Sequence, residues 1–223
     1  MNFTQNNKKI FFLKKNAKNA GFTIIELLVV IFIFGVISSL VIFNYGAFRS
    51  DVSVENLAQD VALTIRRAQI YAVSTKGADN TTFPSYGVHF NIPGTTPILG
   101  TDKSFVFFAD LPDYPVIGQY DQNSIGCGTI VSSAINQDEC MEIINIATSD
   151  KIKEICDDRV CYDETSNPSV DIVFTRPNTE ALFCFKVGSS PCSTPSNVKI
   201  KLSSINGTER IVNVWNTGLI GVK

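Results

Sequence analysis

The chain has 223 residues, of which 44% are hydrophobic and 18% are charged, and its formal net charge is −2. This length can hold one membrane span and one globular domain, and the acidic balance argues against nucleic acid as a partner. The sequence contains no G-x-S-x-G motif and no phosphate-binding glycine loop. We therefore predict a protein that is not an enzyme and needs no cofactor.

Residues 1–21 form a basic leader. The leader has no acidic residue and carries five lysines, namely Lys8, Lys9, Lys14, Lys15 and Lys18. Without these five positive charges the net charge changes from −2 to −7, so the rest of the chain is acidic. Lysines before a span and an acidic remainder after it predict a cytoplasmic N-terminus and an extracytoplasmic bulk.

Residues 22–43 form an apolar run that is interrupted by one charged residue, Glu26. A helix of this length is about 33 Å long, which is enough to cross the hydrocarbon core of a bilayer. The run is longer than the apolar region of a secretory signal peptide, and no small-x-small cleavage site follows it. The sequence therefore predicts a single-pass span in the lipid bilayer. An uncleaved signal anchor is the alternative, but it leaves Gly21 and Glu26 unexplained.

The start of this run resembles the G-F-T-x-x-E-L signature of type IV prepilins and type II secretion pseudopilins. The matching residues are Gly21, Phe22, Thr23, Ile24, Ile25, Glu26 and Leu27. The resemblance implies that a prepilin peptidase cuts between Gly21 and Phe22 and that the new Phe22 amine is N-methylated. It also implies that Glu26 neutralises the amine of an adjacent subunit during assembly. Such a pairing is physically reasonable because a lone charge in an apolar bundle is costly.

Residues 44–76 are predicted to continue the helix with an amphipathic pattern. Apolar residues recur at spacings of three and four, at Val54, Leu57, Val61, Ile65, Ala68 and Ala72. The opposite face holds Glu55, Gln59, Asp60, Arg66 and Arg67. We expect the apolar stripe to pack on the following domain, and the helix to end near Gly77.

Two features of this helix bear on the class of subunit. Residues 56–77 resemble the minor pseudopilins of the H type and related minor pilins, which have a helix end rich in alanine and arginine before a glycine. Major pilins and major pseudopilins commonly carry a proline near the outer end of the apolar run, and this segment has none. The resemblance therefore implies a minor subunit.

From residue 77 to 223 the pattern is that of a β-rich extracytoplasmic domain. Alternating segments bounded by Pro, Gly, Asn and Ser predict strands at Tyr86–Asn91, Ser104–Ala109, Val170–Thr175, Leu182–Val187, Val198–Ser203, Arg210–Trp215 and Leu219–Val222. Some of these segments resemble strands of H-type pseudopilin domains. Residues 111–168 resemble no known segment, and we predict no strand within them.

All six cysteines lie in this domain: Cys127, Cys140, Cys156, Cys161, Cys184 and Cys192. An even number in an oxidising compartment predicts disulfides, although six cysteines allow fifteen connectivities. Short loops favour Cys127 with Cys140, Cys156 with Cys161, and Cys184 with Cys192. Zinc is the competing interpretation. We predict no metal site, because the sequence has no C-x-x-C pair and no histidine near these thiols.

The sequence contains two further groups of residues that are candidates for a site. His89 is the only histidine and lies within a predicted strand with no evident catalytic partner, so we interpret it as structural. Asp110, Asp113 and Asp121 bracket a loop that could bind calcium, but their spacing differs from an EF-hand, and a solvated turn is favoured.

Together these patterns predict an α+β fold, in which a long N-terminal helix spans the membrane and packs its outer half on an antiparallel β-sheet domain. The implied function is that of a pilin-like structural subunit of the bacterial inner membrane, which then joins a pilus or pseudopilus. Its implied partners are the prepilin peptidase, other pilin or pseudopilin subunits and an inner-membrane assembly platform. The alternative is a single-span, membrane-tethered binding or adhesion domain that does not polymerise.

Overall fold

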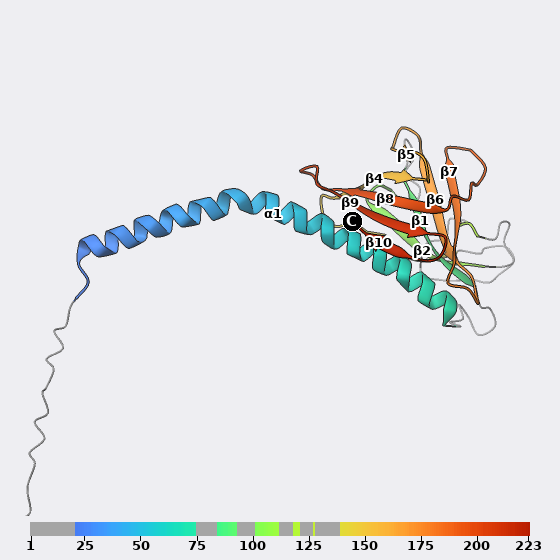
Figure 1. Cartoon of the computed structure of the whole chain (residues 1–223), viewed down its shortest axis with the longest axis horizontal. Coiled ribbons are helices and arrows are strands. Elements are labelled where there is room, and N and C mark those ends of the chain that lie inside the picture. The colour runs from blue at the N-terminus through green and yellow to red at the C-terminus, as the bar shows by residue number, and fades with distance from the viewer. Residues whose placement is uncertain (1–20, 75–83, 93–100, 112–117, 121–126, 128–138) are drawn as a thin grey trace, which may run out of the picture. The chain divides into compact units, whose positions relative to one another are not determined.

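The computed structural model describes residues 21–74, 84–92, 101–111, 118–120, 127 and 139–223. The chain divides into two compact units, Met1–Tyr45 and Gly46–Lys223, which we call the N-terminal and C-terminal units. Helix α1 (Ile24–Val73) contributes residues to both, and the strands belong to the C-terminal unit (Figure 1). The fold is α+β, as predicted.

Two antiparallel sheets make up the strand part of the described chain. The first sheet has the order β3 (Cys140–Asn145), β2 (Ser104–Asp110), β1 (Ser85–Asn91), β6 (Pro168–Phe174) and β7 (Ala181–Val187). The second has the order β10 (Ile220–Val222), β9 (Glu209–Trp215), β8 (Asn197–Ser203), β4 (Lys151–Cys156) and β5 (Cys161–Tyr162). Figure 1 shows α1 running along the strands within the C-terminal unit.

One hydrophobic core joins the helix to both sheets. On β1, Tyr86, Val88 and Phe90 are fully buried in this core, and Gly87 and His89 between them belong to the opposite face. The second sheet alternates in the same way, with Val198, Ile200 and Leu202 on β8 facing the core. This period of two is the reason that these segments form strands with one face buried.

The stripe predicted on the helix is confirmed as the contact with this core. Its members Val54, Leu57, Val61, Ile65, Ala68 and Ala72 are all buried, at 8% exposure or less. The charged residues predicted on the opposite face include two exceptions, which are partly exposed but also contact the strands. Arg67 stacks 4.0 Å above the Phe107 ring and pairs with Glu142 at 2.6 Å.

Glu55 is the second exception. It accepts a hydrogen bond from Arg210 Nε on β9 at 2.5 Å, and this bond holds the pKa of the Glu55 carboxyl below its usual value. Long charged side chains next to an apolar stripe can reach across the helix edge to the packed domain. Charges that flank a buried stripe are therefore part of the helix–sheet contact.

The predicted strands agree with seven observed strands to within one or two residues at each end. The prediction missed β3, β4 and β5, which lie in the segment 111–168 where no strand was expected. Their charged and cysteine residues obscure the alternation, but Ile152 and Ile155 on β4 are buried in the core. A bulge between Ile152 and Glu154 shifts the register and breaks the simple period of two.

The predicted end of the helix and the predicted span have different outcomes. Helix α1 ends at Val73, and Gly77 lies outside the described residues. Within the part of the chain that the structure describes, no helix is long and apolar enough to cross a membrane, in contrast to the span predicted at 22–43.

Candidate functional site at the N-terminal motif

The first turn of α1 is capped by the residues of the motif. The backbone N–H of Glu26 donates to Thr23 Oγ1 at 3.3 Å, and the N–H of Leu27 donates to the Thr23 carbonyl at 3.2 Å. The first N–H groups of a helix have no partner within the helix, so a threonine hydroxyl at this position supplies one. Thr23 is therefore the N-cap residue. Our sequence interpretation missed this role, although the T-x-x-E spacing is its known signal.

Glu26 lies in the first turn of the helix with an exposed side chain. A carboxylate there interacts favourably with the positive end of the helix dipole. A cut before Phe22 would create a cationic amine beside the same helix end, where a positive charge is unfavourable. Glu26 is thus placed where its negative charge opposes the positive end of its own helix.

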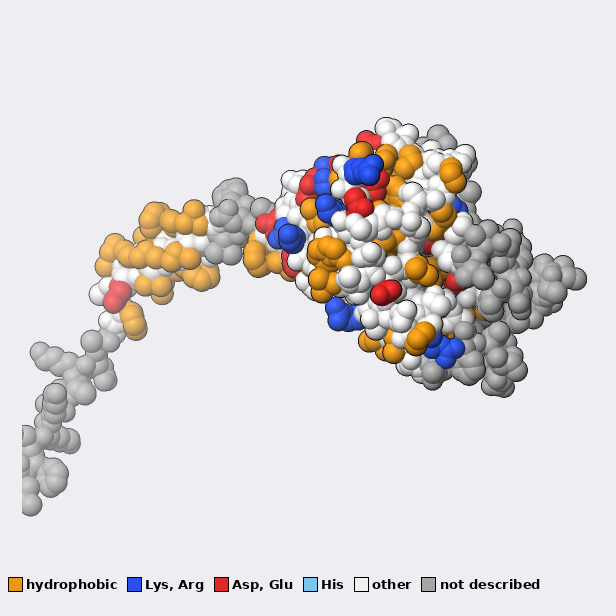
Figure 2. Space-filling model, turned by 45° about the vertical axis from the view of Figure 1, so that its right-hand side comes forward, with side chains coloured by type: hydrophobic (Ala, Val, Ile, Leu, Met, Phe, Trp, Pro, Cys, Tyr) orange, Lys and Arg blue, Asp and Glu red, His pale blue; other side chains and the backbone are white. Residues whose placement is uncertain are grey.

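The helix surface around Glu26 is apolar and uncovered. The large hydrophobic side chains described as exposed between residues 22 and 42 range from 46% exposure at Val29 to 87% at Ile24. Figure 2 shows hydrophobic side chains covering much of the described surface of the N-terminal unit. An exposed apolar surface of this extent indicates contact with lipid or with other protein chains.

Gly21 precedes the helix and has open space around it. A Cβ added to Gly21 would meet no atom within 4 Å, and its φ is not positive. The fold of the chain therefore does not require glycine here. A requirement for glycine would have to come from a molecule that acts on this segment.

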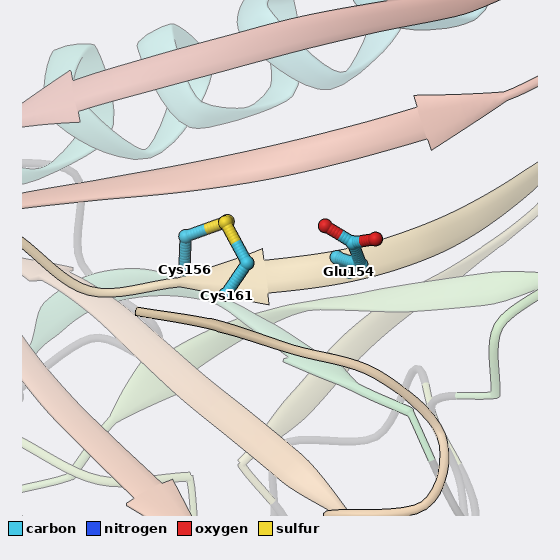
Figure 3. A group of neighbouring side chains, drawn as sticks. All are labelled: Glu154, Cys156 and Cys161. Atoms are coloured by element: carbon cyan, nitrogen blue, oxygen red, sulfur yellow. A yellow bond between two sulfur atoms is a disulfide. The ribbon is translucent and has the colours of Figure 1, made fainter. Parts of the chain in front are cut away.

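The six cysteines are joined in three disulfides: Cys127–Cys140, Cys156–Cys161 and Cys184–Cys192. These are the pairs that short loops favour. Glu154, Cys156 and Cys161 lie close enough to suggest a metal cluster, but the two sulfurs form the Cys156–Cys161 disulfide. Figure 3 shows the two cysteine side chains meeting at sulfur, with Glu154 beside them. The Glu154 carboxylate accepts a hydrogen bond from Lys201 Nζ at 2.6 Å. This donor set does not fit zinc, which binds thiolates.

His89 has a carboxylate partner that the sequence did not reveal. Its Nδ1 lies 2.6 Å from Asp171 Oδ1, and the two residues are direct neighbours on β1 and β6. Their side chains are 13% and 6% exposed, and the Tyr120 ring centroid lies 5.0 Å from that of His89. In the sequence, the one indication of this partner is that Asp171 is a single acidic residue within the apolar segment Val170–Phe174. The arrangement is a buried cross-strand pair joined by a hydrogen bond, which fits the structural interpretation of His89.

Of the three aspartates named as possible calcium ligands, Asp110 is the one that lies within the described residues. Asp110 is 3% exposed, and its Oδ2 accepts a hydrogen bond from the Gly118 N–H at 3.0 Å. Asp113 and Asp121 lie outside the described residues. Asp110 therefore holds the backbone at Gly118.

Comparison with known proteins identifies the motif. Residues 16–42 match the prokaryotic N-terminal methylation motif, and they include the capped helix start described above. No curated protein and no solved structure matches the chain. The motif is typical of type IV pilin-like proteins, which are generally non-enzymatic structural proteins anchored in the inner membrane with an extracytoplasmic domain. Residues 16–42 thus carry a motif typical of type IV pilin-like proteins, and this motif implies processing by a prepilin peptidase.

Proposed function

We propose that this chain is a minor pilin or minor pseudopilin, assembled into a type IV pilus or a type II secretion pseudopilus. In this proposal the peptidase cuts between Gly21 and Phe22, the Phe22 amine is N-methylated, and the subunit leaves the inner membrane when it enters the assembly. The observation that carries the proposal is the combination of the methylation motif with an apolar helix surface that has no partner within the described chain.

In the membrane the apolar helix surface is covered by lipid, and in the assembly it is covered by neighbouring helices. Both keep the surface away from water. Apolar side chains such as Phe22, Ile24 and Phe32 are 84%, 87% and 68% exposed in the isolated chain. Burial of apolar area contributes about 25 cal/mol per Å², so the surface is strongly driven toward lipid tails or neighbouring helices. A bundle of copies of this segment can replace the bilayer, provided that its one carboxylate is paired.

In this proposal, pairing of the Glu26 carboxylate allows the helix to pass from the bilayer into the bundle. Glu26 is the only acidic residue between residues 21 and 45, and its side chain is exposed. The cationic amine of a processed neighbour is the matching charge. Breaking a buried pair on one side costs about 3 to 5 kcal/mol, which is enough to decide whether a subunit is incorporated.

The minor role rests on the sequence of the outer half of the helix. No proline occurs from Asn44 to Val73, so α1 has no proline near the outer end of its apolar run. The Ala- and Arg-containing helix end is the feature shared with H-type minor pseudopilins. A subunit used in few copies, at a tip or in an initiation complex, fits both features.

The mature N-terminus tests the proposal directly. The full-length protein is extracted from membranes of cells with and without an active prepilin peptidase, and its N-terminal peptide is analysed by mass spectrometry. We expect a chain that begins at methylated Phe22 only when the peptidase is active. A chain that keeps Met1 in both strains would contradict the proposal and favour the tethered, unpolymerised binding domain.

A further inference from the structure

A polar cavity lies between α1 and two connections of the C-terminal unit. Its volume is about 560 Å³, within the range of small-molecule sites. Its lining includes Arg49, Ser50 and Ser53 of the helix, Thr148 and Asp150 of the β3–β4 connection, and Ile205 of the β8–β9 turn. The N-terminal motif contributes none of these residues.

Asp150 is the fixed acceptor in the wall of this cavity. It is 2% exposed, and its Oδ2 accepts hydrogen bonds from Ser53 Oγ at 2.5 Å and from Thr148 Oγ1 at 2.6 Å. Lys103 Nζ holds the same connection by donating to the carbonyls of Thr148 and Asp150. Within the described residues no hydrogen bond reaches Asp150 Oδ1, so this carboxylate keeps the capacity to accept another.

Ser50 and Arg49 are the corresponding donors. Ser50 is 9% exposed, and its Oγ is buried without a hydrogen-bond partner in the described structure. Buried hydroxyl groups are nearly always bonded, so this exception calls for an explanation. The Arg49 guanidinium is exposed and forms no ion pair with any described residue. The cavity therefore contains unused donors and one unused acceptor.

We infer that this cavity binds a neutral, polyhydroxylated ligand of the size of a sugar residue. An anion attracted by Arg49 would meet the carboxylate of Asp150, and a cation would meet Arg49. A sugar hydroxyl both donates and accepts, so it can satisfy Asp150 Oδ1 and the Ser50 hydroxyl together. The Ile205 side chain, which is 76% exposed, offers an apolar wall for the C–H face of a sugar ring.

The test uses the full chain in a zwitterionic detergent that contains no sugar. Glucose, galactose and N-acetylglucosamine are each added, and binding is followed by saturation-transfer NMR and titration. We expect binding of at least one sugar, and a loss of affinity of about three- to tenfold in Ser50→Ala and of about tenfold in Arg49→Ala. Arg66→Ala, an exposed arginine on the same helix outside the cavity, is the matched control and should bind as the parent does.

Thermal unfolding separates a binding role of Ser50 from a structural one. Since its hydroxyl has no partner, Ser50→Ala should keep or slightly raise the melting temperature while it weakens binding. The inference is overturned if no sugar binds, if both variants bind as tightly as Arg66→Ala, or if inorganic phosphate binds in place of the sugars. None of these outcomes depends on cleavage at Gly21, so failure here is distinguishable from failure of the proposed pilin role.

Discussion

The two parts of helix α1 have the same backbone structure and opposite surroundings. In the C-terminal unit, the stripe from Val54 to Ala72 is at most 8% exposed and packs on both sheets. In the N-terminal unit, apolar residues such as Ile31 and Phe32 are 61% and 68% exposed. Helical stability in proteins comes mainly from packing of an apolar face, so the two parts must be stabilised differently. Within the described residues no other element packs on the first part, and in the proposed function lipid or neighbouring subunits supply that packing.

The largest expected effect is at Gly21, where only the processing step should depend on the residue. Gly21→Leu should abolish maturation, because a side chain directly before the cut would obstruct the approach of the peptidase. The described part of the chain does not crowd this position, since nothing described lies within 4 Å of a Cβ at Gly21. Mass spectrometry of the membrane-extracted protein measures the outcome.

Gly35→Leu is the matched control for this substitution. A Cβ at Gly35 also meets nothing within 4 Å, but Gly35 lies far from the cut. It should be processed normally. Normal shortening of the Gly21→Leu chain would show that the peptidase does not read this glycine.

The second prediction concerns Glu26, the only acidic residue between residues 21 and 45. Glu26→Leu should be cut after Gly21 but should fail to enter the assembly, because an unpaired amine costs about 3 to 5 kcal/mol in an apolar bundle. Glu26→Asp should fall between the two, since the charge remains and the reach is one methylene shorter. Co-purification with sheared filaments, or with the isolated membrane complex, measures incorporation relative to total membrane protein.

A local capping role of Glu26 predicts a different pattern. If Glu26 acts only on its own helix end, its loss should cost about 0.3 to 1 kcal/mol of helix stability, and Thr23→Ala should have an effect of similar size. Equal incorporation of Glu26→Leu and the wild type would refute the pairing of Glu26 with a neighbouring amine. Loss of incorporation in Glu26→Leu with normal incorporation of Thr23→Ala would separate pairing from capping.

The third prediction compares buried and exposed positions within one turn. Ile65→Ala should destabilise the C-terminal unit by about 2 to 5 kcal/mol, because Ile65 is fully buried in the core and leaves a cavity. Leu63→Ala, which removes a side chain that is 63% exposed, should change the free energy of unfolding by no more than about 0.5 kcal/mol. Thermal or denaturant unfolding monitored by circular dichroism gives both values. Equal losses at the two positions would mean that the exposed face of α1 is also packed.

Periodicity predicted the parts of the fold that repeat without interruption. The stripe ending at Ala72 has regular helical spacing, and β1 or β8 alternates cleanly, so local pattern and burial agree. Strand β4 was missed because a bulge after Ile152 displaces its next core residue, and its exposed positions are charged. A bulge depends on pairing with β8, which is distant in the sequence, so no local pattern reveals it.

The site residues also divide into those that a local sequence pattern reveals and those that only contacts between distant segments bring together. Gly21, Phe22 and Glu26 belong to one contiguous motif that the sequence alone shows, and their roles stay predictions. Short loops favoured the cysteine pairs that the structure contains. The partner of His89 was missed because Asp171 lies 82 residues away and meets it only through the pairing of β1 with β6. The cavity around Ser50 and Asp150 was missed for the same reason, since it is formed by three separate segments.

The smallest expected effect concerns an exposed carboxylate that joins two loops of the C-terminal unit. Asp158 accepts hydrogen bonds from the N–H groups of Ser196 and Asn197 and from the Ser196 hydroxyl. These bonds, the Ser196 N–H first, lower the pKa of the Asp158 carboxyl. The folded pKa lies below the unfolded pKa, which is near 3.9, so the stabilisation is fully present above about pH 5 and is lost as pH falls through the folded pKa.

Because Asp158 is exposed and screened by water, its contribution to the free energy of unfolding should stay below about 1 kcal/mol. Asp158→Asn should therefore lower the melting temperature slightly at pH 7 and reduce the difference in melting temperature between pH 7 and pH 3.

Glu180→Gln, at an exposed carboxyl with no hydrogen bond among the described residues, should leave the acid sensitivity as in the wild type. If Asp158→Asn kept the full acid sensitivity, the loop contact would not be the group that titrates. A drop well above about 1 kcal/mol at pH 7 would instead show that this contact is as important to the C-terminal unit as a residue of its core.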